Sequence, residues 1–253
     1  MRVAVLSDVH GNAAALGPVL ADIRSWGFDL LVSAGDVAAF GPQPEASLDM
    51  LEEAGALFVR GNNDRYLSTQ GHQGSPGRDE ADTAERAASL QWCRDRLGPA
   101  RIASMSTWPV RLEINGVEIV HASPGDDEAG VWPEMTEEEL CGYVSGVMVC
   151  GHTHLPFVKT LRCGIVANAG SVGWNLDGDT RASWAALQNG PGGWQAQIRR
   201  VPYDIQQALA QLRMHNPPWS AAVEHYISTA TWRSPSGQGA YRRPSPASQR
   251  SGQ

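Results

Sequence analysis

The chain has no long uncharged apolar run and no excess of positive charge. None of its 253 residues belongs to a stretch of about 20 apolar residues, the length that crosses a bilayer. The apolar start ends at Ser7 and Asp8, and no signal-peptide cleavage pattern follows. A net charge of -7 argues against broad nucleic-acid binding, which needs a basic surface. We therefore expect a cytoplasmic protein with no membrane partner.

Cysteine is scarce too, and its four copies include no CxxC pair. They stand at Cys93, Cys141, Cys150 and Cys163. Close pairs of cysteines are the usual sign of a zinc site, and regular spacing is the sign of a disulfide framework. Because neither is present, we expect free and mostly buried thiols, as in a reducing compartment.

The composition predicts a globular core followed by a polar tail. Hydrophobic residues make up 42% of the chain and charged residues 19%. From about Arg233 the sequence consists largely of Ser, Pro, Gly, Gln and Arg. Such a segment cannot bury enough apolar surface to offset its ordering entropy. The sequence predicts a single domain over residues 1–232 and a disordered tail over 233–253.

The stretch from Val149 to His154 contains the first functional signal. The apolar run 147–150 predicts a buried strand, which ends at Gly151 and is followed by His152 and His154. After a sharp turn both imidazoles can face the same space, and neutral imidazole binds most divalent transition metals. A His-x-His pair can also be a surface accident, so other signals are needed.

Polar residues recur where the first three predicted strands end. Strands are expected at 2–6, 30–33 and 57–60, with helices at 13–26 and from Pro44 onward. The polar residues that follow the strands are Asp8, His10, Asp36 and Asn62. This alternation of strands and helices predicts an α/β fold with largely parallel strands.

The second half repeats the pattern. The dipeptide Asn115-Gly116 joins predicted strands at 110–114 and 117–120, a strong hairpin signal, and His121 follows the second arm. Further strands are expected at 157–161, 164–167, 183–187 and 195–201, and helices at about 82–97, 204–214 and 221–227. A capping box at Thr136 predicts another short helix, and residues 68–78 read as a loop.

Together the strand-end motifs resemble the calcineurin-like metallophosphoesterases. That family carries Asp-x-His, Gly-Asp, Gly-Asn-His-Asp/Glu, a strand-end His and Gly-His-x-His. This chain has them in the same order over roughly residues 1 to 175, as Asp8-Val-His10, Gly35-Asp36, Gly61-Asn-Asn-Asp64, His121 and Gly151-His-Thr-His154. The residues at 8–12, 41–44 and 168–173 are similar to those of the compact prokaryotic branch of this family, which includes phosphodiesterases and dinucleoside polyphosphate hydrolases.

The resemblance implies a fold and a ligand set. The fold would be an α/β sandwich of two mixed β-sheets packed face to face, with helices outside in four layers. The implied ligands of a first metal are Asp8, His10, Asp36 and His154. The implied ligands of a second are Asp36, Asn62, His121 and His152, with Asp36 bridging. Asp36, Asn62, Asp64 and His121 are the expected catalytic residues.

Such a ligand set suits hydrolysis of a phosphate ester. Two divalent metals about 3.5–4 Å apart can share a water and lower its pKa, which supplies a bridging hydroxide near neutral pH. Mn²⁺ or Fe fits a mixture of carboxylate and imidazole better than Ca²⁺, with Zn²⁺ or Ni²⁺ as alternatives. The expected partner is a small phosphorylated substrate, with nucleotides among the candidates.

One position departs from the family pattern. Where relatives often have His, this chain has Asn63, which cannot protonate a leaving group. This favours a substrate with a good leaving group, an aryl phosphate or a phosphoanhydride. We expect Asp64 to orient His10. Asn12, a candidate helix N-cap, joins Asn63 and Arg65 as an expected substrate contact, although a surface salt bridge is an equal alternative for Arg65.

Other functions stay open on the sequence alone. A phosphomonoesterase or a phosphoprotein phosphatase is compatible with the ligands, but the latter would need more arginines than Arg65 and Arg60 near the site. A non-catalytic scaffold of the same fold would tend to lose ligands, and here every position is filled. Among nine tryptophans, Trp132 and Trp174 could stack on a base, and core packing is the expectation for most.

Overall fold

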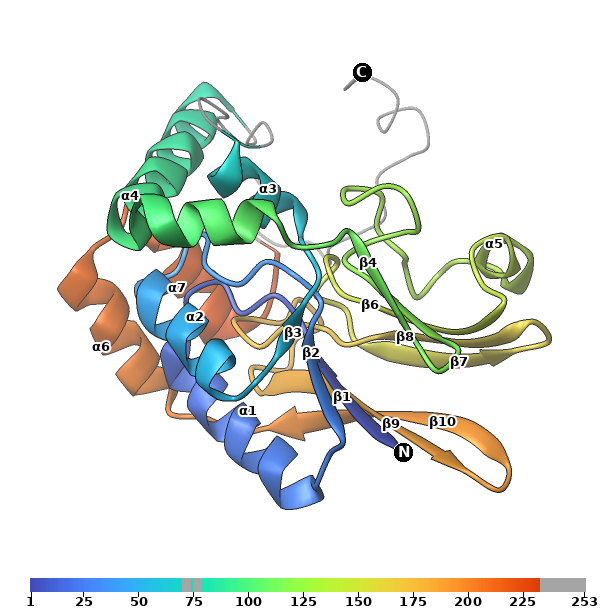
Figure 1. The fold of residues 1–253 in the computed structure, drawn as a ribbon. Coiled ribbons are helices and arrows are strands. Elements are labelled where there is room, and N and C mark those ends of the chain that lie inside the picture. Colours follow the sequence, from blue (N-terminus) through green and yellow to red (C-terminus); the bar gives the residue numbers. More distant parts are fainter. Residues whose placement is uncertain (70–73, 75–78, 233–253) are drawn as a thin grey trace.

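Ten strands form two mixed five-stranded sheets in this computed structural model, which describes residues 1–69, 74 and 79–232 (Figure 1). The first sheet has the order β10–β9–β1–β2–β3. Its strands are β1 (Arg2–Leu6), β2 (Leu30–Ser33), β3 (Leu57–Phe58), β9 (Ala182–Gly190) and β10 (Gly193–Val201). The strands β1, β2 and β3 run parallel, whereas β9 is antiparallel to β1 and to β10.

The second sheet has the order β4–β5–β6–β8–β7. Its strands are β4 (Arg111–Ile114), β5 (Val117–Val120), β6 (Gly146–Cys150), β7 (Phe157–Leu161) and β8 (Gly164–Asn168). The central three strands are parallel, and β4 and β7 pair antiparallel at the two edges. This is the expected arrangement of two mixed sheets.

Alternation along the strands explains why the sheets pack against each other. Val3 and Val5 of β1 share a buried cluster with Val147 and Val149 of β6, between the sheets. The alternate residues Ala4 and Leu6 face a second cluster, formed with the helices. Because successive strand residues point to opposite faces, one apolar strand fills both layers. The central strands are buried on both sides, so their sequences are apolar runs from which the strands could be predicted.

Helices gather on the side of the first sheet, and one short helix lies beside the second (Figure 1). One cluster is shared by α1 (Ala13–Trp26), α2 (Pro44–Glu53), α4 (Glu80–Ser106), α6 (Ile205–His215) and α7 (Ser220–Thr229). The short α5 (Glu137–Cys141) lies beside the second sheet, where Leu140 packs with Met148. The α4 helix runs beyond the expected residue 97 through a kink at Gly98, whose φ is 72°.

One element was not expected. Residues after β3 were interpreted as a loop, but α3 (Asn62–Ser68) begins there. Its seven residues are too few and too polar to show an apolar period. The segments 70–73 and 75–78 of the expected 68–78 loop, and the tail 233–253, lie outside the described residues.

The cysteines differ from expectation in one pair. Cys141 ends α5, Cys163 stands in the turn between β7 and β8, and the two form a disulfide. Packing of α5 on the second sheet brings the two residues together, although 22 positions separate them in sequence. Cys93 and Cys150 are free and buried, as predicted. Within the described residues, no helix has both the length and the apolar composition to cross a bilayer.

Candidate metal centre

Seven predicted ligand residues meet at the carboxyl ends of parallel strands. Asp8 and His10 follow β1, Asp36 follows β2, and Asn62 opens the helix after β3. His121 follows β5, and His152 and His154 follow β6. The side chains are buried except that of His152, which is partly exposed. Both sheets therefore supply ligands, and the peptide N–H of His152 donates across to Asp8 Oδ2 at 2.8 Å.

The backbone turns sharply at five of these residues. The left-handed φ values are 54° at Asp8, 48° at His10, 56° at Asp36, 67° at His152 and 57° at His154. Asp and His occupy this region more readily than most non-glycine residues, yet they carry a conformational cost there. Gly151 permits the close approach, because a Cβ there would collide with Ser7 and the Asp8 carboxylate.

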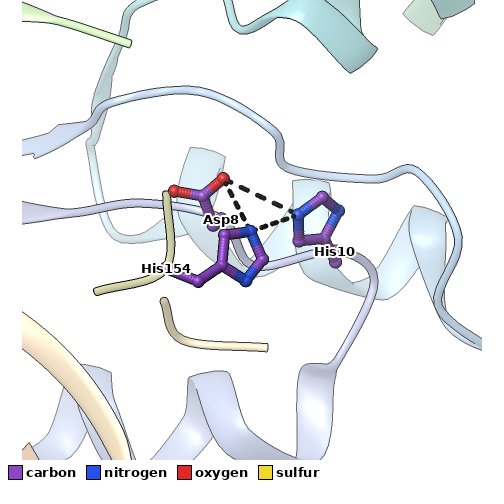
Figure 2. A group of neighbouring side chains, drawn as sticks. All are labelled: Asp8, His10 and His154. Atoms are coloured by element: carbon purple, nitrogen blue, oxygen red, sulfur yellow. Dashed lines mark hydrogen bonds and ion pairs between the residues drawn. The ribbon is translucent and has the colours of Figure 1, made fainter. Parts of the chain in front are cut away.

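A first group consists of Asp8, His10 and His154 (Figure 2). The Nε2 atoms of His10 and His154 lie 3.2 Å apart. Asp8 Oδ1 lies 3.2 Å from Nε2 of His154 and 3.6 Å from Nε2 of His10. Three potential ligand atoms from two sheets therefore face one small space.

A second group surrounds His121. Its Nε2 atom lies 3.0 Å from Asn62 Oδ1, 3.2 Å from His152 Nδ1 and 3.5 Å from Asp36 Oδ2. Asp36 Oδ2 is also 3.9 Å from Nε2 of His10, so this carboxylate lies between the two groups. Asp8, Asp36 and His121 also present ligand atoms within 4.8 Å of one another.

Hydrogen bonds to backbone carbonyls orient three of the imidazoles. Nδ1 of His10 contacts Ala39 O at 3.1 Å, Nδ1 of His121 contacts Ala34 O at 2.8 Å, and Nδ1 of His154 contacts Trp174 O at 2.7 Å. A carbonyl can only accept, so Nδ1 donates, and a neutral ring then carries its lone pair on Nε2. All three Nε2 atoms therefore present lone pairs to the site.

The site brings acceptor atoms together without hydrogens between them. Asp8 Oδ1 is buried and has no hydrogen-bond donor among the described residues. Its nearest polar neighbours are the Nε2 atoms of His10 and His154, which are acceptors in the neutral rings. A buried acceptor without a donor is unfavourable, and a cation would satisfy all three atoms. The residues present therefore fit a divalent metal.

The carboxylate and the imidazole at the centre stabilise each other's charge. Burial raises the pKa of Asp8, but the charge of a protonated His154 and hydrogen bonds from protonated His10 and His154 outweigh burial and hold that pKa well below its ordinary value. Burial lowers the pKa of His121, but the charges of Asp36 and Asp8 outweigh it and leave the pKa raised. Desolvation and the neighbouring His121 lower the pKa of His152 to about 4. Asp8 is thus ionised and His152 neutral at pH 7, as metal ligands must be.

Asp64 does not orient His10, so that prediction is wrong. Its carboxylate accepts the backbone N–H groups of Asp36 at 2.7 Å, Gly61 at 2.9 Å and Val37 at 3.0 Å. It therefore fixes the Asp36 loop against the start of α3. Burial and the Asp36 charge raise the pKa of Asp64 to about 6, because three amides only partly compensate.

Two expected substrate contacts have structural partners instead. Asn12 Oδ1 accepts from Ala15 N at 3.2 Å as the cap of α1, and its Nδ2 donates to Gly173 O at 2.9 Å. Arg65 makes a bidentate pair with Asp127 and a further bond to Glu128 at 2.7 Å, so the salt-bridge alternative describes it.

Asn63 lies inside the site, beside Asp36. Its backbone N–H donates to Asp36 Oδ1 at 3.0 Å, and its side-chain amide donates to Asp36 Oδ2. Trp174, expected from the sequence as a residue that could stack on a base, instead stacks on His10, with ring centroids 4.5 Å apart. Trp132 and Trp174 are both buried, which matches core packing rather than an exposed stacking platform.

Comparison with known proteins agrees with this geometry. Residues 1–189 match the calcineurin-like phosphoesterase superfamily domain, and the chain belongs to that superfamily. It is 26% identical over 245 residues to the uncharacterized protein MJ0912 of Methanocaldococcus jannaschii, covering 86% of this chain and 94% of that protein. Membership supports a hydrolase that acts on phosphate esters.

Solved structures share the fold. A metallophosphoesterase from Sphaerobacter thermophilus superposes with a TM-score of 0.72 at 24% identity, covering 91% of this chain and 100% of that one. The hypothetical protein PH1004 from Pyrococcus horikoshii OT3 gives a TM-score of 0.75 at 17% identity, covering 92% and 99%. These likenesses confirm the expected two-sheet architecture.

Proposed function

We propose that this protein is a dinuclear metal-dependent phosphoesterase that hydrolyses a phosphodiester or a phosphoanhydride. The observation that carries the proposal is the convergence of Asp8 Oδ1 with the Nε2 atoms of His10 and His154. All three buried atoms are acceptors when both rings are neutral and donate from Nδ1. Such a cluster is costly without a cation and is a strong ligand set with one.

The first ion would be held by Asp8, His10, Asp36 and His154. The second would be held by Asp36, Asn62, His121 and His152. Asp36 lies within 3.9 Å of a nitrogen in each group, which supports its role as the shared ligand. The neutral Asn62 oxygen leaves the second site with more net positive charge than a third carboxylate would.

Bound divalent ions would supply Lewis acidity that lowers the pKa of a water and neutralises charge on the phosphate. The chain contributes orientation. Backbone carbonyls fix three imidazoles, and Asp64 fixes the Asp36 loop through three N–H groups. Preorganised ligands of this kind reduce the reorganisation needed during the reaction.

Asn63 limits the choice of leaving group. Its amide occupies the position that often holds a His in the family and contacts Asp36. An amide can donate a hydrogen bond but cannot give up its proton. A leaving group that departs as a stable anion, such as an aryl oxide or a phosphate, is therefore favoured.

The space beside His121 supports a diester over a polyphosphate chain. A cavity of about 250 Å³ is lined by His121, Ser123, Asp126 and Asp127, with Val110 and Gly125. The nearby Arg65 is paired with Asp127 and Glu128, so its charge is already compensated. Additional phosphates would meet two carboxylates there, whereas a diester carries a single negative charge.

A metal-reconstituted substrate screen tests the proposal. Protein freed of metal with a chelator would be loaded with Mn²⁺ and assayed on bis-p-nitrophenyl phosphate, p-nitrophenyl phosphate and diadenosine tetraphosphate. The variant Asp36→Asn would be treated in the same way as the control. We expect the diester to be hydrolysed fastest and the variant to lose at least about 100-fold in kcat/KM, since it loses the shared ligand. Equal rates for wild type and variant on all three substrates would refute the enzyme assignment.

A further inference from the structure

Trp174 contacts two histidines of the first group in two different ways. Its indole stacks on the His10 ring, with centroids 4.5 Å apart and an interplanar angle of 16°. Its backbone carbonyl accepts the Nδ1–H of His154 at 2.7 Å. One residue therefore restrains the ring plane of His10 and the tautomer of His154.

The loop that carries Trp174 also holds the third member of the group. Ser171 Oγ donates to Asp8 O at 2.7 Å and accepts from Trp174 N at 2.9 Å. Gly173 N donates to the same Asp8 oxygen at 2.9 Å. Asp8, whose φ is left-handed, is thus fixed by two donors from this loop.

The support is one-sided. Among the described residues, the hydrogen bonds and ring contacts of Ser171, Gly173 and Trp174 do not reach Asn62, His121 or His152. His121 is oriented instead by Ala34 O, from the other sheet. A change at Trp174 should therefore affect one group of ligands and spare the other.

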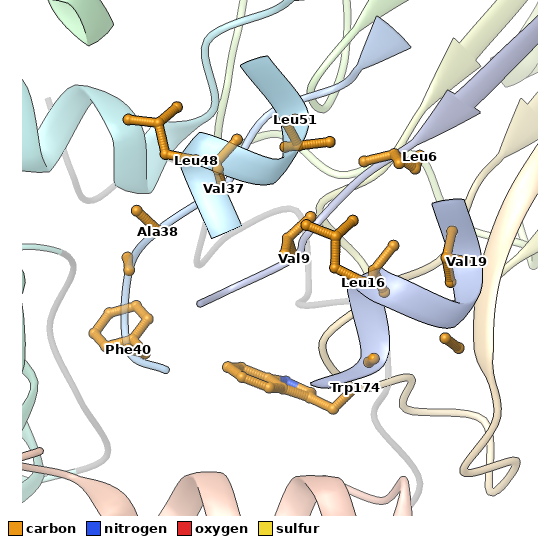
Figure 3. Close-up of a cluster of buried hydrophobic side chains, with 14 of the residues drawn as sticks. Leu6, Val9, Leu16, Val19, Val37, Ala38, Phe40, Leu48, Leu51 and Trp174 are labelled. Carbon is orange, nitrogen blue, oxygen red and sulfur yellow. The ribbon is translucent and has the colours of Figure 1, made fainter. Parts of the chain in front are cut away.

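The Trp174 ring is itself fixed by packing against other buried side chains. It is buried in the cluster beneath the helices, near Val9 and Leu16 (Figure 3). The Tyr226 ring of α7 stacks on it, with centroids 5.8 Å apart and an angle of 23°. Offset-stacked rings resist rotation, so the indole keeps the His10 ring in plane.

We infer that Trp174 is a positioning residue that sets the metal affinity of the Asp8–His10–His154 site and not that of the site around His121. The inference rests on the proposed division of the ligands into two sites. Partners that orient a metal ligand typically change affinity by about 10- to 100-fold when they are replaced. Because the carbonyl to His154 persists in every variant, we expect the lower end of that range for a change of the side chain.

Mn²⁺ titration of the chelated full chain tests this, with free Mn²⁺ followed by electron paramagnetic resonance. Wild type should bind two ions. Trp174→Met keeps a flexible apolar side chain but removes the ring, and it should weaken one site about 10-fold while leaving the other unchanged. Trp174→Phe keeps a stacked ring and should change that site by less than about three-fold.

A matched control separates positioning from packing. Trp108 is also buried and stacks on Phe58, with centroids 4.4 Å apart and an angle of 12°. Trp108→Met should lower the thermal midpoint and leave both Mn²⁺ affinities unchanged. If Trp174→Met does not fold, Tyr226→Leu, which loosens the indole from behind, should weaken the same single site by a smaller factor.

Several results would overturn the inference. They are unchanged Mn²⁺ affinity in Trp174→Met, equal weakening of both sites, the same effect from Trp108→Met, or fewer than two ions on wild type. The titration needs no substrate. The proposed function alone would therefore be refuted if wild type binds two ions but hydrolyses no phosphate ester. The inference about Trp174 would still hold if Trp174→Met weakens only one of the two sites.

Discussion

Asp8 Oδ1 and His154 Nε2 lie 3.2 Å apart, and in the neutral ring neither atom has a hydrogen to offer the other. The other oxygen of Asp8 accepts the peptide N–H of His152 at 2.8 Å. The carboxylate thus joins the two sheets on one side and meets a lone pair on the other. In the metal-free protein with neutral rings, this contact is unfavourable.

Asp8→Asn should separate stability from metal binding. The amide oxygen can still accept from His152 N, while the amide N–H₂ gains His154 Nε2 as an acceptor. The metal-free variant should therefore unfold at or above the wild-type temperature. Mn²⁺ at 100 times its Kd should stabilise wild type by about 2.7 kcal/mol and the variant much less. Calorimetry with and without Mn²⁺ measures both.

The control for this experiment is Asp22→Asn. Asp22 pairs with Arg199 at 2.8 Å, away from the ligands, and this pairing lowers the pKa of Asp22. Its substitution should lower both thermal midpoints and preserve the shift on adding Mn²⁺. A full Mn²⁺ shift in Asp8→Asn would contradict the assignment of Asp8 as a ligand.

Metal binding should release a proton from His121. The pKa of this imidazole is raised above 6.5, because Asp36 and Asp8 outweigh the opposing effect of burial. At pH 6.5 more than half of the metal-free rings are therefore protonated, and a metal must displace that proton. Affinity should rise as the pH increases through the raised pKa and then level off.

Calorimetric titration with Mn²⁺ at pH 6.5, in two buffers of different ionisation enthalpy, counts the proton. We expect the release of between about half a proton and one proton per protein from His121. His152→Ala should keep the release, since the pKa of His152 is about 4 and its ring is already neutral. His121→Ala should lose it. No buffer dependence in wild type would contradict the prediction.

Asn63→His should extend the substrate range. The amide beside Asp36 cannot protonate a leaving oxygen, whereas an imidazole can. Diesters with alkyl leaving groups should react at least about 10-fold faster, and bis-p-nitrophenyl phosphate should change little. Asn63→Gln, which again has no acidic proton, should show no gain. If alkyl diesters gain nothing from the histidine, protonation does not limit the reaction.

The Cys141–Cys163 disulfide should stabilise the edge of the second sheet. With a sequence separation of 22 between the cysteines, the restriction of the unfolded chain stabilises the fold by about 3 kcal/mol. In urea unfolding, the variant carrying both Cys141→Ser and Cys163→Ser should have a free energy of unfolding that is lower by this amount. Dithiothreitol should destabilise wild type but not this variant. Unreduced, urea-unfolded wild type should titrate two thiols, from Cys93 and Cys150. Four thiols would refute the bond.

The sequence predicted the site residues wherever a metal-binding type of side chain directly follows a buried strand. Buried strands are apolar on both faces, so β1, β2 and β6 could be located, and Asp8, Asp36 and the His152–His154 pair follow them directly. Their meeting point then follows from parallel pairing, which places the carboxyl ends of neighbouring strands at one edge.

The remaining contacts had no sequence signature. Asp64 binds peptide N–H groups, and Trp174 offers a peptide carbonyl, which every residue type possesses. Which backbone group lies within reach depends on the folded loops. The same holds for Cys141 and Cys163, whose proximity depends on how α5 packs on the sheet. Short α3 lacked a detectable period for the separate reason of its length.

The left-handed φ values of the five proposed ligand residues affect which substitutions the chain would accumulate in evolution. Each costs the fold about 1 kcal/mol that glycine would not incur, roughly 5 kcal/mol in all, against a typical net stability of 5–15 kcal/mol. Once selection for hydrolysis is relaxed, glycine at positions 8, 10, 36, 152 or 154 would remove both the strain and a ligand. A descendant that loses the activity can thus become more stable. We expect its first substitutions to glycine at these five positions.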